Sequence, residues 1–106
     1  MALEDRGKSE ESKYKHEQEV AFKVRNRRNK LFGMWIAETH LGKNGEDALN
    51  YAKDVVMADF ERPGDDDVFE KVREDLDAAK VEISDHMLRK QMELCDSQAR
   101  AQVMSE

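Results

Sequence analysis

The stretch that most constrains the fold is residues 20–42, VAFKVRNRRNKLFGMWIAETHLG. Its apolar residues recur at helical spacing and share one face, with charged residues on the other faces: Val20, Val24, Leu31 and Trp35. From Leu31 onward, apolar residues point in every direction around the axis, which a helix tolerates only where neighbouring elements cover it. We therefore expect one helix that runs from a solvated end into a buried end.

The composition favours an all-α fold. Of the 106 residues, 40% are charged and 39% are apolar, while Gly and Pro total six, a mix typical of exposed helices. A chain of this length forms one small domain. Three more helices are predicted after the first, because capping residues precede apolar stripes at helical spacing.

Each predicted helix has an expected cap. Gly42 ends the first helix, Asn44 caps the second, and Ser84 caps the fourth, where flanking apolar residues form a hydrophobic staple. Asp67 with Glu70 is predicted to cap the third in an acidic relative of the capping box. The expected buried stripes are Ala48, Ala52, Val55, Val56 and Phe60 in the second helix, Val68, Phe69, Val72, Leu76 and Ala79 in the third, and Leu88, Met92, Cys95, Ala99 and Val103 in the fourth.

The N-terminal residues have little to bury. No apolar residue follows Leu3 before residue 13, and Gly7-Lys8-Ser9 is predicted to fray a helix. We expect a mobile arm over residues 1–18, a packed domain over residues 19–106, and a first helix from about Glu10 to Leu41.

The charge and the cysteine content limit which compartment and which partners the protein is expected to have. The lone cysteine, Cys95, and the charged N-terminus favour a cytoplasmic protein without a secretory signal, and no apolar run approaches the roughly 20 residues that span a bilayer. The net charge of −6 is unevenly spread, since residues 13–30 are basic and residues 59–77 are acidic. This polarity favours a specific protein partner over nucleic acid.

No group of residues has the pattern of a catalytic or metal site. The histidines and the cysteine lack short ligand spacing: His16, His40, His86 and Cys95. The run at residues 65–67 lacks the alternating ligands of a calcium loop, and no phosphate-binding loop is present. The sequence therefore predicts a protein that is not an enzyme and requires no cofactor.

The strongest polar signal is a basic cluster: Lys23, Arg25, Arg27, Arg28 and Lys30. Three interpretations remain open, namely a solvated face, a surface for an acidic protein or a nucleotide phosphate, and, least favoured, a nucleic-acid site. Arg27, Arg28 and Lys30 are the candidate nucleotide ligands. Asn29, a poor helix former within the cluster, points to a role for its side chain.

Four short blocks of the sequence match a known family: RRNKL at 27–31, GMWIAE at 33–38, YAKDVV at 51–56 and ADFE at 58–61. In these blocks the sequence closely resembles the zeta-subunit family of alphaproteobacterial rotary ATP synthases. The similarity continues through Pro63-Gly64-Asp65 and Ser84-Asp85-His86, and so covers nearly the whole chain.

The resemblance implies a four-helix bundle that anchors an inhibitory N-terminal arm. Members block ATP hydrolysis when the arm lodges between the catalytic head and the central rotor of the F-type ATP synthase. The arm carries over onto residues 1–18, with Leu3, Asp5, Arg6 and Tyr14 as its contact residues, and Leu3 stands where members often have an aromatic. The alternative function is an adenine-nucleotide sensor that binds ADP or ATP. We expect a monomer, peripheral to the membrane-bound enzyme.

Overall fold

The computed structural model describes the backbone of residues 2–61 and 65–106, and the side chains of residues 15–60 and 67–106. These residues form four helices and no strand: α1 (Ala2–Thr39), α2 (Gly45–Glu61), α3 (Asp65–Ala78) and α4 (Asp85–Met104). The predicted all-α four-helix bundle is confirmed.

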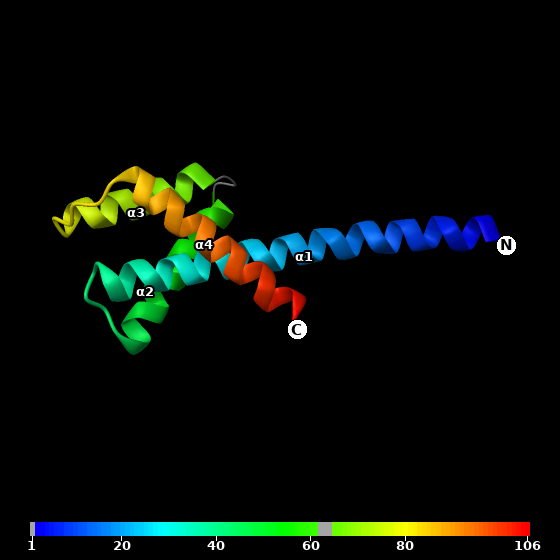
Figure 1. The fold of residues 1–106 in the computed structure, drawn as a ribbon, viewed down its shortest axis with the longest axis horizontal. Coiled ribbons are helices and arrows are strands. Elements are labelled where there is room, and N and C mark those ends of the chain that lie inside the picture. The colour runs from blue at the N-terminus through cyan, green and yellow to red at the C-terminus, as the bar shows by residue number, and fades with distance from the viewer. Residues whose placement is uncertain (1, 62–64) are drawn as a thin grey trace.

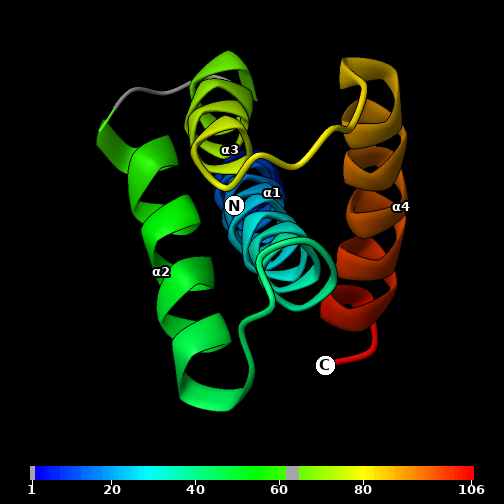
Figure 2. The ribbon, with the colours of Figure 1, turned by 90° about the vertical axis from the view of Figure 1, so that its left-hand side faces the viewer.

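Helix α1 is the element on which the others pack. Figure 2 looks along the molecule and shows α2 and α4 on opposite sides of α1, with α3 above it. Helices α2 and α4 make most of the contacts with α1, while α3 packs chiefly on α2. The buried end predicted for the first helix is confirmed, since Phe32, Ile36 and Ala37 have no exposed surface.

The apolar stripes are largely as predicted. In α4, all five stripe residues are buried, from Leu88 to Val103. In α3, Val68, Val72 and Leu76 are fully buried, and the ring of Phe69 meets that of Phe32 at 6.0 Å.

Three stripe residues do not belong to the core. Val56 of α2 is only half-buried and lines a surface groove. Phe60 of α2 is 51% exposed, and Ala79 is exposed because α3 ends one residue before it. On α2 the core face instead passes through Tyr51, which is 7% exposed. The prediction followed one broad stripe on α2, whereas the helix has two.

The helix ends confirm two of the predicted caps. Gly42 adopts a left-handed conformation with φ of 65°, and the Ser84 hydroxyl accepts a hydrogen bond from the Met87 amide at 3.2 Å. The acidic capping box is wrong, because α3 already includes Asp67 as its third residue. Helix α2 begins at Gly45, directly after the predicted cap Asn44.

The first helix is longer than predicted. It begins at Ala2 rather than near Glu10, and it continues through Gly7-Lys8-Ser9 without a break. Figure 1 shows its N-terminal half extending beyond the bundle. The molecule is accordingly elongated, with a radius of gyration of 17.1 Å and extents of 64 × 24 × 22 Å, whereas a compact domain of about 100 residues has a radius of gyration near 13 Å. Mobility of residues 1–18 stays a prediction.

Helices α1 and α2 approach most closely at Gly33. A Cβ atom built on Gly33 would lie 2.8 Å from the Cα of Ala52 and 3.2 Å from the Cβ of Val55. The first distance is shorter than the contacts that real Cβ atoms make, and the atom it meets belongs to the backbone. Any side chain at position 33 must therefore push the two helices apart.

We expect Gly33→Ala to destabilise the bundle by about 1–3 kcal/mol, because overpacking outweighs the gain in helix propensity. The check is the melting temperature by circular dichroism, where each kcal/mol corresponds to roughly 4–8 °C. Gly7→Ala is the matched control, since it makes the same change in α1 before the packed segment. A Gly33→Ala variant that melts no lower than the wild type contradicts the close approach.

Tyr51 links α2 to α3 from within the core. Its hydroxyl donates a hydrogen bond to Asp75 at 2.9 Å, and Lys71 donates to the same carboxylate oxygen at 3.1 Å. Burial, and then the hydrogen bond to Asp75, raise the pKa of Tyr51 well above its usual range. The folded protein therefore keeps the Tyr51 proton under conditions in which an unfolded chain loses it.

The stabilisation by Tyr51 should fade in alkaline solution. Below about pH 10, the ordinary tyrosine pKa, both states are protonated and Tyr51→Phe should lose about 1 kcal/mol of unfolding free energy. Above that pH the unfolded wild type gains stability by ionising, so the difference between wild type and Tyr51→Phe should shrink. Urea unfolding at pH 7 and near pH 11 measures the difference in unfolding free energy between wild type and Tyr51→Phe, with Tyr14→Phe as control. A difference that is the same at both pH values contradicts the prediction.

Candidate functional site

The basic cluster of α1 does not form a single site, because its arginines face different helices. Arg25 donates a hydrogen bond at 2.6 Å to Asp59 of α2, a carboxylate that is only 8% exposed. Arg27 turns the other way and donates hydrogen bonds to Gln102 of α4 at 3.1 Å and to Glu106, which lies just beyond α4. These two arginines join α1 to both of its main neighbours.

Arg28 lies apart from the other two candidate nucleotide ligands. Its guanidinium donates at 3.2 and 3.1 Å to the side-chain oxygen of Asn29, and its charge reaches Cys95 of α4. Arg27 and Lys30, by contrast, line one groove together. The structure therefore unites two of the three residues predicted to bind a nucleotide, and the nucleotide site stays a prediction.

Asn29 has the structural role that its poor helix propensity suggested. Its side chain is completely buried, its oxygen accepts from Arg28, and its Nδ2 has no hydrogen-bond partner. Because the side chain is buried, its contacts are with other parts of the protein. It is not among the residues that line the groove.

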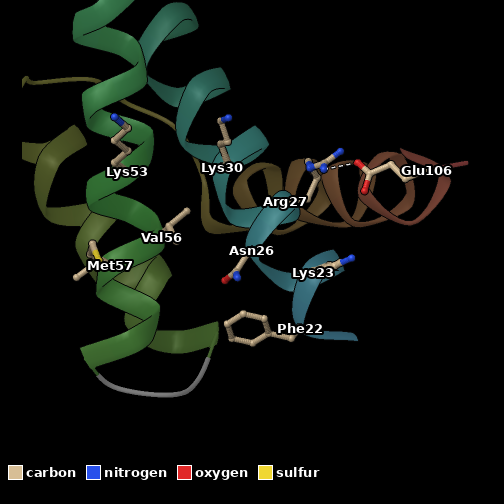
Figure 3. Close-up of a pocket in the computed structure, with 9 residues that line it drawn as sticks. All are labelled: Phe22, Lys23, Asn26, Arg27, Lys30, Lys53, Val56, Met57 and Glu106. Carbon is tan, nitrogen blue, oxygen red and sulfur yellow. Dashed lines mark hydrogen bonds and ion pairs between the residues drawn. The ribbon is translucent and has the colours of Figure 1, made fainter. Parts of the chain in front are cut away.

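The groove containing Arg27 and Lys30 has a volume of about 710 Å³ and lies between α1 and α2, next to the C-terminus. Its lining combines apolar and basic side chains, shown in Figure 3: Phe22, Lys23, Asn26, Arg27, Lys30, Lys53, Val56, Met57 and Glu106. The contribution of α2 to this groove was not predicted from the sequence. The signal was available, since Lys53, Val56, Met57 and Phe60 recur at helical spacing on a second face of that helix.

The second candidate region is the N-terminal part of α1. Leu3, Asp5, Arg6 and Tyr14 all lie on this helix, but their side chains are outside the described residues. The side chains described next, residues 15–19, are all exposed. Val20 is half-buried, and Val24 at 6% exposure is the first buried residue among the described side chains of α1. The bundle therefore begins to cover α1 between residues 20 and 24.

A family model described as ATPase inhibitor subunit zeta matches residues 1–102. The chain belongs to this family. The match includes the projecting half of α1 as well as most of the bundle. No curated protein and no solved structure matches the chain.

Membership of the zeta family assigns the chain a regulatory role as an ATPase inhibitor. The candidate metal ligands of the sequence are dispersed in the described part of the chain, where no three His, Cys, Asp or Glu side chains could hold an ion. Cys95 is buried in the core and its pKa is raised by burial, as befits an inert thiol. His40 packs edge-on against Trp35, with ring centres 4.8 Å apart. None of the described helices is long and apolar enough to cross a bilayer.

Proposed function

We propose that this zeta-family protein inhibits ATP hydrolysis by an F-type ATP synthase, with residues 1–18 inserted between the catalytic head and the central rotor. The bundle of residues 19–106 stays outside and anchors the inserted segment. Inhibition is steric and involves no covalent chemistry. The protein acts at the cytoplasmic side of the membrane, as a peripheral subunit.

The observation that carries the proposal is the departure of α1 from the bundle. Residues 15–19 are exposed, and the helix continues from there to Ala2. Eighteen residues of helix are roughly 27 Å long, long enough to reach from the surface of a protein assembly into its interior. A helix without neighbours in its own domain is available to pack against those of a partner.

The packing of α1 explains how such a segment could resist a turning rotor. The inserted part and the core part belong to one continuous helix, and Phe32 and Ile36 fix the core part without exposed surface. Withdrawing the inserted part would require the whole bundle to move with it. The bundle also keeps the segment at a high local concentration beside its site.

The contact residues of the segment follow from the family resemblance. The residues expected to contact the catalytic and rotor subunits are Leu3, Asp5, Arg6 and Tyr14. The rest of this polar segment carries alternating acidic and basic residues. A polar segment of this kind gains most of its ordering energy from the partner.

Deleting residues 2–18 should abolish inhibition of the cognate ATPase and leave the melting temperature nearly unchanged, because the packed segment of α1 begins after the deletion. Steady-state ATP hydrolysis and circular dichroism measure the two effects. A synthetic peptide of residues 1–18 added to the deletion variant is the control, and it should restore little inhibition because the covalent attachment is lost. Full inhibition by the deletion variant contradicts the insertion mechanism.

Helix formation in the segment should govern potency. Gly7→Ala should lower the inhibitory concentration by up to roughly fivefold, the equivalent of the ~1 kcal/mol that alanine adds to a helix over glycine. Glu10→Pro should raise it strongly, since proline within a helix costs about 3 kcal/mol.

Inhibition titrations of these two variants, with Lys15→Ala as a nearly neutral control, measure the effect. Equal potency of Gly7→Ala and Glu10→Pro would show that the segment does not bind as a helix.

A further inference from the structure

Three large apolar side chains remain about half exposed where α1 and α2 meet. Phe22 is 53% exposed, Met57 54% and Phe60 51%, and the two rings touch with centres 5.7 Å apart. Single exposed apolar residues are common on protein surfaces, whereas a cluster of them marks an interaction site. Phe22 and Met57 line the 710 Å³ groove described above, and Phe60 extends its apolar side.

The groove is basic although the protein is acidic. Its lining contains four basic residues, Lys23, Arg27, Lys30 and Lys53, against one acid, Glu106, on a chain with a net charge of −6. Arg27 is already bonded to Glu106. In the part of the chain described by the structure, the three lysines have no acidic partner.

Two of the basic side chains lie away from the aromatic ring of the groove. Figure 3 shows Lys30 and Lys53 at one end and Phe22 at the other, next to Lys23. A complementary occupant is therefore amphipathic, with carboxylates facing the lysines and apolar side chains facing Phe22 and Met57.

We propose that this groove binds an acidic amphipathic helix of the ATP synthase. The proposal rests on the proposed function and identifies a second contact with the same enzyme, made by the bundle rather than by the N-terminal segment. Two observations favour a helix over a small molecule. The walls are half exposed, whereas small-molecule sites enclose most of their ligand, and two neighbouring helices with an apolar floor are the usual receptor for a third. The lysines select acidic partners and orient them.

The position of the groove suits a docking role. Phe22 follows the inhibitory segment by only four residues on the same helix. A partner helix bound here would hold the bundle at the point where α1 leaves it. Docking in the groove would then raise the local concentration of the segment at its own site.

The decisive variant is Lys30→Glu/Lys53→Glu in the full-length chain. Its matched control is Lys80→Glu/Lys90→Glu, which changes two exposed lysines outside the groove and gives the same net charge. We expect the groove variant to bind the purified catalytic complex of the cognate synthase roughly tenfold more weakly, and the control within about twofold of wild type. Inhibition at saturating protein should be unchanged in both, because the N-terminal segment is intact.

The apolar contribution is tested with Met57→Ser against Leu94→Ser, a residue of α4 that is 52% exposed. Only Met57→Ser should weaken binding to the complex. Circular dichroism melting of all four variants shows whether they fold, and equal affinities of groove and control variants overturn the proposal.

The outcomes separate this proposal from the proposed function. A wild-type chain that inhibits hydrolysis, together with a groove variant of unchanged affinity, overturns the groove alone. Wild type that neither binds nor inhibits the complex overturns both. If calorimetry shows that the wild type binds ATP and the groove variant does not, while affinity for the complex is unchanged, the occupant of the groove is a nucleotide. If the wild type self-associates and the groove variant does not, the occupant is a second copy of the chain. Either result overturns the proposal that a partner helix binds in the groove.

Discussion

The contact between α1 and α2 at Gly33 is the constraint on which the rest of the structure depends. It brings the backbones close enough for Val55 to pack directly against α1, and the neighbouring residues Phe32 and Ile36 are fully enclosed in the core. A small domain has little surplus stability. This domain forms a core from few apolar residues because its helices pack closely around the central helix α1.

The same rod connects the core with the projecting segment. Because α1 is continuous from Ala2 to Thr39, the segment outside the bundle cannot change direction independently unless the helix breaks. The packed part of α1 therefore sets the direction of the segment that lies outside the bundle. A flexible linker between them would give the segment freedom but would remove this alignment.

The sequence allowed the fold to be predicted where one helical face was decisive. The α4 stripe from Leu88 to Val103 and the enclosed end of α1 both followed from spacing alone. The α2 stripe was harder, because its two apolar faces adjoin and only tertiary packing decides that Val55 is buried and Phe60 exposed. The start of α1 was missed because local propensity at Gly7 predicts fraying. The groove was missed for a related reason, since spacing within one helix does not reveal residues that a second helix places beside it.

The arginines and the lysines of the basic cluster have different roles because their side chains differ in chemistry. In the described side chains, Arg25 and Arg27 carry hydrogen bonds to α2 and α4, which suits the planar guanidinium with its several donors. Lys23 and Lys30 instead keep their charge at the surface, where a compact ammonium is well hydrated. The arginines stabilise the bundle and the lysines give one of its faces a positive potential. The run of basic residues in the sequence thus has two functions. Only the direction of each side chain in the structure shows which function a residue has.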